Sequence, residues 1–294
     1  MSDVNERRDF LKLGMLGLAG GALVAGASML PDAKKAYAAA DPNSVLRKVL
    51  DRGHLIVGTG STNAPWHFED ESGNLVGMDI TMGQILAKGL FADPTKIEFV
   101  QQDPAARIPN ITTGKVDITI QFMTISSDRA QLVNFSRPYY VEGVALLTLP
   151  GADGKNFDQL KEMGNKARVS ILQNVGAEEG VHEVLPDSVV TQLDTQANVI
   201  QALESHRVDA AAVDLSTVRW MVARTPDKYA DAGKWWRTML YGAALPQSDL
   251  DWLTFVNQCF TCAMFGHENE LYYPAFKKYF GQDVPAHTPG FPYI

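Results

Sequence analysis

The sequence has little positive charge for its length of 294 residues. It holds 26 lysines and arginines against 34 aspartates and glutamates, for a net charge of −8. Beyond residue 40 the balance is 21 basic against 30 acidic residues, a charge of −9. Nucleic-acid binding requires basic surface, so this balance argues against a nucleic-acid partner. A small ligand is still compatible with it, because a local basic site can lie inside an acidic protein.

Cysteines and clustered metal ligands are also scarce. The two cysteines, Cys259 and Cys262, are three positions apart in a stretch with helical periodicity, where a disulfide would be strained. We therefore predict two buried, reduced cysteines. The six histidines are scattered, and the motifs of serine hydrolases, zinc proteases and nucleotide-binding loops are missing. We expect no cofactor and no metal.

A long uncharged run occurs once, near the N-terminus. Residues 13–30 follow the pair Arg7-Arg8 and precede an alanine-rich segment, which is the layout of a secretory signal. The paired arginines resemble a twin-arginine export signal. A membrane anchor is the alternative, because 18 uncharged residues approach the length of a bilayer span. We predict a signal peptide over residues 1–40, cleaved after Ala38 or Ala40, and a periplasmic mature protein without a transmembrane span.

The rest of the chain alternates strand and helix periodicity. Helices are predicted over 45–52, 79–90, 108–113, 157–163, 177–184, 197–205, 250–265 and 271–280. Strands are predicted over 54–58, 97–100, 116–120, 144–149, 168–172, 189–193, 208–213 and 239–245. Asp79 is expected to cap its helix. The alternation predicts an α/β protein with parallel strands flanked by helices, in which ligands bind beyond the carboxyl ends of the strands.

Two strand-ending segments carry the polar groups that such a site needs. The first, 114–140, contains Thr124 and Arg129, and the second, 207–214, ends on Asp214. With other ordered pieces of the chain, these segments resemble the periplasmic amino-acid-binding proteins of ABC importers, the family-3 solute receptors. The pieces are Leu55–Thr59, Ala64-Pro65-Trp66, Gly73–Asp79, Arg107-Ile108-Pro109, Gly114–Asp117, Met123-Thr124-Ile125 with Arg129, and Phe135–Tyr139. The resemblance runs from about Val45 to Phe280.

This resemblance implies a two-lobed periplasmic-binding-protein fold. Each lobe is expected to be a mainly parallel sheet flanked by helices, with a cleft and a two-crossing hinge between them. Lobe 1 would comprise residues 41–147 and 239–294, and lobe 2 residues 151–238. The crossings are expected near 147–150 and 236–240. Asp117 and Asp209, at the starts of strands and away from the cleft, are interpreted as structural.

The resemblance also assigns roles in holding a free amino acid. Arg129 would bind the carboxylate bidentately, helped by the N–H of Thr124 and, across the cleft, by the N–H groups of the loop at Gly176. Asp214 would pair with the ammonium, to which the Thr124 hydroxyl and the Phe122 carbonyl are further acceptors. Taken one by one, these residues also fit ordinary surface or capping roles.

The positions expected to contact the ligand side chain depart from familiar relatives. Gly60 stands where receptors for basic amino acids carry an aspartate, and Asn63 and Pro104 stand where aromatic residues often lie. Trp66 is either an aromatic wall or a packing residue beside Pro65. Arg107 has the spacing of an arginine that binds a distal carboxylate. An acidic or polar amino acid, such as glutamate, aspartate or an amide, is therefore expected.

Two further functions fit the same fold. A few relatives with this fold are prephenate or arogenate dehydratases, and an enzyme would need a general acid such as Glu142, Glu178 or Glu179. A sensor that reports its ligand to a membrane receptor is the other alternative. We expect a binding protein without catalysis, a monomer whose partners are a free amino acid and an ABC transporter permease.

Overall fold

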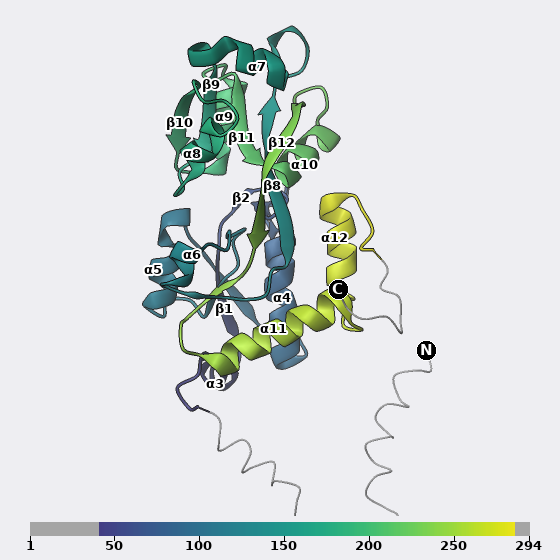
Figure 1. The fold of residues 1–294 in the computed structure, drawn as a ribbon. Coiled ribbons are helices and arrows are strands. Elements are labelled where there is room, and N and C mark those ends of the chain that lie inside the picture. The colour runs from purple at the N-terminus through teal and green to yellow at the C-terminus, as the bar shows by residue number, and fades with distance from the viewer. Residues whose placement is uncertain (1–40, 286–294) are drawn as a thin grey trace, which may run out of the picture. The chain divides into compact units, whose positions relative to one another are not determined.

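Two five-stranded sheets, each flanked by helices, organise the computed structural model, which describes residues 41–285 (Figure 1). The first sheet is mostly parallel, with β13 antiparallel to both of its neighbours. Its order is β5 (Ile97–Gln101), β1 (Leu55–Thr59), β6 (Ile118–Thr119), β13 (Ala244–Leu245) and β7 (Asn134–Phe135). This mixed α/β architecture confirms the predicted fold class. The predicted signal peptide lies outside the described residues.

The second sheet combines three parallel strands with two long antiparallel ones. Its order is β10 (Val189–Leu193), β9 (Arg168–Leu172), β11 (Ala210–Asp214), β8 (Tyr140–Thr148) and β12 (Ala230–Tyr241). A separate small sheet is formed by β2 (Thr62–Asn63), β3 (His67–Glu69) and β4 (Leu75–Val76). We call the part around the first sheet lobe 1 and the part around the second sheet lobe 2.

Helices cover both sheets. Lobe 1 carries α3 (Val45–Arg52), α4 (Met78–Phe91), α5 (Arg107–Thr112), α6 (Ser127–Ala130), α11 (Leu250–Phe265) and α12 (Tyr272–Phe280). Lobe 2 carries α7 (Phe157–Met163), α8 (Ala177–His182), α9 (Gln196–Glu204) and α10 (Leu215–Arg224). Short 3-10 turns lie at Pro104–Ala106, Gly151–Asp153 and Gly164–Lys166. Most of these elements match the predicted ranges to within two residues. Among the described residues, none of the helices is both long enough and apolar enough to cross a bilayer.

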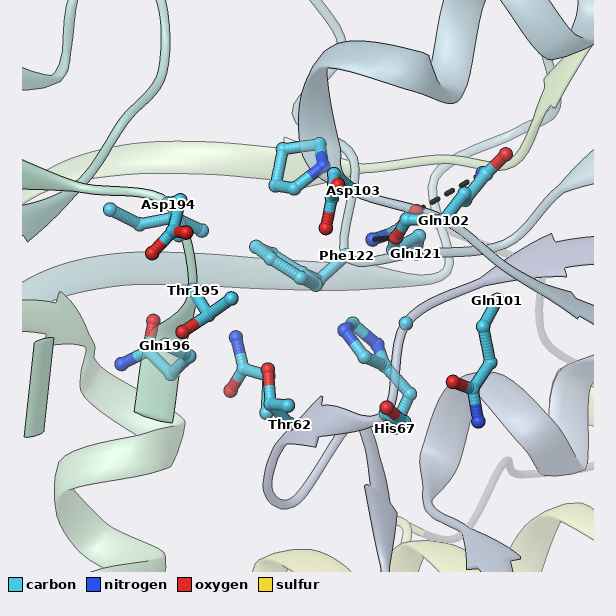
Figure 2. A pocket seen from close by; sticks show the side chains of 15 residues that line it. Thr62, His67, Gln101, Gln102, Asp103, Gln121, Phe122, Asp194, Thr195 and Gln196 are labelled. Atoms are coloured by element: carbon cyan, nitrogen blue, oxygen red, sulfur yellow. Dashed lines mark hydrogen bonds between the residues drawn. The ribbon is translucent and has the colours of Figure 1, made fainter. Parts of the chain in front are cut away.

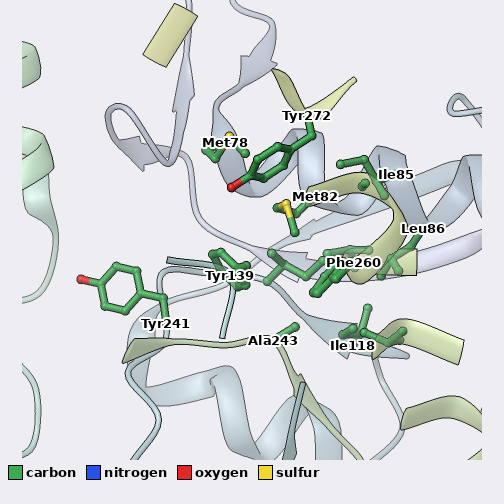
Figure 3. Packing of buried hydrophobic residues seen from close by; sticks show 14 of the residues in the cluster. Met78, Met82, Ile85, Leu86, Ile118, Tyr139, Tyr241, Ala243, Phe260 and Tyr272 are labelled. Carbon is green, nitrogen blue, oxygen red and sulfur yellow. The ribbon is translucent and has the colours of Figure 1, made fainter. Parts of the chain in front are cut away.

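The largest core lies in lobe 1, between the first sheet and helices α4 and α11 (Figure 3). Met82, Leu86 and Ile118 are fully buried there, and Phe260 of α11 packs onto them. Burial of such side chains stabilises the fold by about 1.5–3 kcal/mol each. The C-terminal helices therefore complete lobe 1, as the sequence predicts.

The first crossing between the lobes comes earlier than the sequence predicts. Strand β8, from Tyr140, pairs along its length with β12 of the second sheet, whereas β7 at Asn134–Phe135 still belongs to the first. The apolar run that precedes Pro150 is therefore the buried far half of β8, and not the hinge. The second crossing follows β12, which carries register shifts on both sides of Trp235–Trp236. This lies close to the predicted 236–240.

Two predictions of structural roles are confirmed and one is wrong. Asp117 binds Arg52 and the N–H of Ile56, and Asp209 binds Arg168, so both aspartates hold strand starts. Asp79 does not cap α4, because Gly77 occupies the N-cap position and the Asp79 carboxylate points into the core. A capping side chain must stand at the N-cap position and accept a first-turn N–H, and here tertiary contacts take the carboxylate instead.

The cysteines of α11 are free thiols of intermediate exposure. Burial raises the pKa of the Cys259 thiol to about 12. Its sulfur packs close to Gly89 of α4, where an added methyl group would lie 2.8 Å from Sγ. Cys259 thus serves helix packing, and both cysteines are less buried than the sequence predicts.

Candidate functional site

Arg129 is held in the first turn after the strand-ending segment of lobe 1. It lies on α6, whose N-cap residue Ser126 accepts a hydrogen bond from the Arg129 N–H. One guanidinium nitrogen, Nη1, donates to the carbonyl of Thr124 at 2.8 Å. The other, Nη2, donates to Oδ1 of Asn174 in lobe 2 at 2.7 Å. The structure therefore brings Arg129 to the boundary between the lobes.

Thr124 lies beside this guanidinium and pairs with Tyr241 at the end of β12 through an isolated bridge. Among the described residues, its hydroxyl donates to a sulfur atom, Sδ of Met239, at 3.8 Å. A thioether is a weak acceptor, so the hydroxyl remains available for a better partner.

Asp214 ends β11 and begins α10. Its Oδ2 atom is buried and has no hydrogen-bond partner within the described part of the chain. The Tyr241 hydroxyl acts electrostatically on the Asp214 carboxyl and partly opposes the rise in its pKa. Burial, followed by the neighbouring carboxyl of Glu142, raises the pKa of Asp214 well above its ordinary value. A buried carboxylate oxygen without a partner is costly, and a cation placed there would relieve that cost.

Gly176 adopts a left-handed conformation, with φ of 71°, immediately before α8. Its carbonyl accepts a hydrogen bond from Arg237 of β12 at 2.9 Å. The loop that it ends also contains Asn174, the partner of Arg129. The predicted lobe-2 loop is therefore already in contact with the predicted carboxylate-binding arginine.

A cavity of about 190 Å³ opens between the two lobes (Figure 2). Its walls are mainly polar and uncharged, with Phe122, Leu172 and Pro104 as apolar patches. The lining residues are Gly60, Ser61, Thr62, Asn63, His67, Gln101, Gln102, Asp103, Pro104, Gln121, Phe122, Leu172, Asp194, Thr195 and Gln196. None of them is lysine or arginine. Of the predicted ligand contacts, the lining includes Asn63 and Phe122 but not Thr124, Arg129, Gly176, Asp214, Arg107 or Trp66.

Arg107 is buried behind the cavity wall, with 2% of its surface exposed. Its Nε atom donates to the carbonyl of Pro104 at 2.9 Å, and Nη1 donates to the carbonyl of Gln121 at 3.2 Å. The guanidinium lies 5.5 Å from the centre of the Phe122 ring. Burial and then the charge of Arg129 lower the pKa of Arg107 to about 10. Arg107 thus fixes two backbone carbonyls of the wall, a role that its sequence spacing does not reveal.

Trp66 is also placed outside the cavity. Its side chain has no exposed surface and packs edge-on against Tyr140 and Tyr241, with ring centres 4.8 and 5.3 Å away. The indole Nε1 donates to Oγ of Ser216, in the first turn of α10, at 2.9 Å. Trp66 therefore occupies the packing role that was one of its two predicted roles, and it links the lobes.

Sequence reasoning missed the pair formed by His67 and Asp79. The His67 Nδ1 atom lies 2.8 Å from Oδ2 of Asp79, and the same oxygen accepts the N–H of Phe122 at 2.9 Å. The other oxygen of Asp79 accepts from the Tyr139 hydroxyl at 3.0 Å. The imidazole stacks on the Phe122 ring, with centres 4.8 Å apart. With Nδ1 engaged, only Nε2 of His67 is left to meet the contents of the cavity (Figure 2).

Gly60 is explained by this histidine. A side-chain carbon at position 60 would lie 2.7 Å from Cδ2 and 2.8 Å from Nε2 of His67. Contacts this short are essentially never tolerated, so His67 fills the space that an aspartate at position 60 would need. Spacing in the sequence could not reveal this, because the two residues meet only across the β2–β3 hairpin.

The three predicted candidates for a general acid differ in burial: one is buried and two are exposed. The Glu142 carboxylate is buried on β8 and accepts hydrogen bonds from the Ser216 hydroxyl, at 2.5 Å, and from the N–H of Gly143. Burial raises the pKa of Glu142. Glu178 and Glu179 are exposed on α8, and Glu178 accepts from Gln192.

Comparison with known proteins agrees with this architecture. Residues 55–219 match the model of the bacterial extracellular solute-binding proteins, family 3, and the chain belongs to this family. Two curated relatives bind amino acids. The L-cystine-binding protein of Escherichia coli is 30% identical over 276 residues, covering 92% of this chain and 96% of that protein. The glutamine-binding protein of Geobacillus stearothermophilus is 28% identical over 218 residues, covering 74% of this chain and 82% of that protein.

A solved structure shows the same fold. An ancestral amino-acid-binding protein, described as a precursor of cyclohexadienyl dehydratase, superposes with a TM-score of 0.69 at 28% identity. The match covers 81% of this chain and all of that chain. The chain is thus a member of an amino-acid-binding receptor family whose fold also stands close to an enzyme lineage.

Proposed function

We propose that this chain is a periplasmic receptor that captures a free amino acid by lobe closure and delivers it to an ABC transporter permease. One observation carries the proposal. Arg129 of lobe 1 donates to the carbonyl of Thr124, which is bridged to Tyr241, and Tyr241 interacts electrostatically with Asp214 of lobe 2, whose Oδ2 lacks a hydrogen-bond partner among the described residues. A guanidinium and a buried carboxyl group near one residue suit the carboxylate and the ammonium of an amino acid, because an ammonium beside Asp214 favours the ionised carboxyl.

The proposed contacts follow from these positions. The ligand carboxylate would take the Arg129 nitrogen that now binds Asn174, together with the N–H groups of Thr124 and of the Gly176 loop. The ammonium would bind Oδ2 of Asp214 and the Thr124 hydroxyl, with the Phe122 carbonyl as a third acceptor. Lobe 1 would supply Arg129 and Thr124, and lobe 2 would supply Asp214 and the Gly176 loop. Only the closed receptor would therefore place partners around both charges of the ligand.

For the ligand side chain, we propose an uncharged polar group rather than an acid. Both acidic and polar ligands agree with the sequence, but Arg107 donates to backbone carbonyls from behind the cavity wall, and the cavity lining holds no arginine or lysine. Gln196 of lobe 2 presents a buried Nε2 donor that has no partner among the described residues, and His67 of lobe 1 presents Nε2. A side chain with both a donor and an acceptor, such as a carboxamide, would satisfy both walls.

A ligand screen tests this assignment. Calorimetry with L-glutamine, L-asparagine, L-cystine, L-glutamate and L-arginine should give the tightest binding for a neutral polar ligand. L-cystine belongs in the screen because a relative with 30% identity is named for it. A preference for arginine would contradict the interpretation of Gly60, and a preference for glutamate would contradict the uncharged side chain.

The Arg129→Ala variant tests the α-carboxylate contact. Loss of a charge-assisted bidentate partner should weaken the best ligand by about 2–5 kcal/mol. The matched control is Arg207→Ala, which removes an exposed arginine of lobe 2 that donates to Ser205. Near-native affinity in Arg129→Ala, with the control unchanged, would remove Arg129 from the site.

We propose binding without turnover, by a monomer. The buried Glu142 carboxylate is occupied by Ser216 and Gly143, and Glu178 and Glu179 lie on the exposed surface of α8. Incubation with prephenate and arogenate should therefore leave both compounds unchanged. Turnover that disappears in Glu142→Gln would support the dehydratase alternative instead.

A further inference from the structure

A second cavity, also of about 190 Å³, lies between α10 of lobe 2 and α12 of lobe 1. We call it the α10–α12 cavity. It shares no lining residue with the first cavity. Arg219, Trp220 and Arg224 line it from α10, and Phe276 and Lys278 line it from α12. None of these residues has a part in the proposed amino-acid site.

The charge of this cavity is opposite to that of the chain. Three cations line it, and no aspartate or glutamate is among the lining residues, although the chain as a whole carries −8. Within residues 41–285, no carboxylate lies within ion-pair distance of Arg219, Arg224 or Lys278, whereas the adjacent Lys277 is paired with Asp283. Glu142 and Asp70 act on Arg219 and Lys278 only beyond ion-pair distance, so an anion bound in the hollow would be attracted by all three cations.

The walls between the cations are aromatic. The guanidinium carbon of Arg224 lies 4.0 Å from the centre of the Trp220 ring, which fixes its planar group against the wall. Tyr140 and Phe280, also lining residues, stack with ring centres 4.7 Å apart. A guanidinium held over an indole keeps its N–H groups available to bind a carboxylate, while the neighbouring rings contact an apolar body.

We propose that the α10–α12 cavity is a second ligand site, which binds a small aromatic carboxylate. The carboxylate lies against Arg219 and Arg224, and the ring lies among Trp220, Phe276 and Phe280. Lys278 closes the site from α12 as a third positive charge. Binding at this cavity does not require a ligand in the proposed amino-acid site.

The two lobes contribute opposite walls, so occupancy is linked to their arrangement. Trp220 of α10 contacts Phe68 and Tyr279 of lobe 1, with ring centres 5.6 and 5.9 Å away. The same helix begins directly after Asp214, its N-cap residue. An anion held between α10 and α12 therefore favours the lobe arrangement in which both walls are in place.

Phenylacetate is a suitable probe, because it joins one ring to one carboxylate. Its binding to the full chain is measured by calorimetry and by saturation-transfer NMR. Phenylacetamide, which has the same shape without the charge, serves as the ligand control. The test variant is Arg219→Gln with Arg224→Gln. The control variant is Lys161→Gln with Arg207→Gln, which removes the same charge from exposed positions of lobe 2.

We expect the unaltered chain to bind phenylacetate saturably and phenylacetamide at least tenfold more weakly. The test variant should bind phenylacetate at least tenfold more weakly than the unaltered chain, and the control variant should not. Absence of saturable binding to the unaltered chain, or equal affinity in the test and control variants, overturns the proposal. If the double variant fails to fold, as judged by circular dichroism, Lys278→Gln is used, for which a clear loss of affinity is likewise required. L-Glutamine titrations of the same samples report on the amino-acid site separately.

Discussion

At the scale of single residues, two buried carboxyl groups, those of Asp79 and Asp214, have opposite surroundings. The Asp79 carboxylate is hydrogen-bonded by His67, by the Tyr139 hydroxyl and by the N–H of Phe122, and these bonds hold the three residues in place. Asp214 keeps one buried oxygen without a partner. The first carboxylate is an internal structural support, and the second is costly in the ligand-free protein, which is the pattern expected for a group that awaits a cation.

This difference predicts a pH effect on stability. Burial raises the pKa of Asp214 above its ordinary 3.8, so the folded chain holds this proton more tightly than the unfolded chain. The stability from this group is complete below about pH 3.8 and is lost as pH rises through the raised, folded-state pKa. Asp214→Asn removes that loss. Its free energy of unfolding, relative to the unaltered chain, should therefore increase as pH rises above about 4.

Urea denaturation of the ligand-free proteins between acid and neutral pH measures this increase. Asp227→Asn, at an exposed aspartate of lobe 2, is the matched control and should show no such trend. A difference between Asp214→Asn and the unaltered chain that stays constant with pH would contradict the prediction.

At the scale of elements, α10 is a helix that sequence periodicity missed. It contacts both lobes and lines the α10–α12 cavity. It begins at the end of β11, with Asp214 as its N-cap residue. Its first turn reaches across to lobe 1, where Thr217 donates to Oδ1 of Asn63 at 3.1 Å and Ser216 accepts from Trp66. Its outer face lines the α10–α12 cavity. Its apolar residues are spread over more than one face because it contacts both lobes.

Ser216 is the most constrained side chain of α10, and its hydrogen bonds lead to a prediction about stability. It accepts from the Trp66 indole and donates to Glu142, and all three side chains are buried. Ser216→Ala leaves a buried donor and a buried carboxylate without this partner, and should lower the free energy of unfolding by about 1–3 kcal/mol. Chemical denaturation measures the loss.

Ser205→Ala, which removes an exposed hydroxyl at the end of α9, is the control and should change stability little. Equal effects of the two substitutions would show that the hydrogen bonds between Trp66, Ser216 and Glu142 contribute nothing specific.

Most other elements were predictable from sequence, and the exceptions have physical causes. Helix α7, strands β9 and β10, and helix α11 match their predicted bounds, because each has a clear period and a clear break at its ends. Strand β12 starts at Ala230, nine residues before its prediction, because Gly233 and the charged residues beside Trp235-Trp236 break the apolar pattern, and the strand takes its conformation from pairing with β8. Only the tertiary structure supplies that pairing.

At the scale of the whole described chain, direct contacts join the lobes. Arg129 binds Asn174, Trp66 binds Ser216, and Thr217 binds Asn63. These contacts hold the two lobes together and favour closure. A ligand that replaces the Arg129–Asn174 contact and pairs Asp214 adds affinity for the closed state alone, so it shifts the population towards closure.

This population shift predicts a change in size. Small-angle scattering should give a smaller radius of gyration when a saturating neutral polar amino acid is added. Asp214→Asn, which removes the partner of the ammonium, should show no such decrease at the same ligand concentration. A radius that does not change on saturation of the unaltered chain would contradict ligand-driven closure.

The sequence by itself determined the family, the α/β class and most element bounds, because periodicity and ordered motifs are local properties of the chain. It also predicted Arg129, Thr124 and Asp214 as one ligand-binding set. The tertiary structure decided which side chains line the cavity. Arg107 and Trp66 turn away from it, and His67 enters it beside Gly60, because packing and buried hydrogen bonds between distant segments choose each orientation. Such contacts leave no period in the sequence.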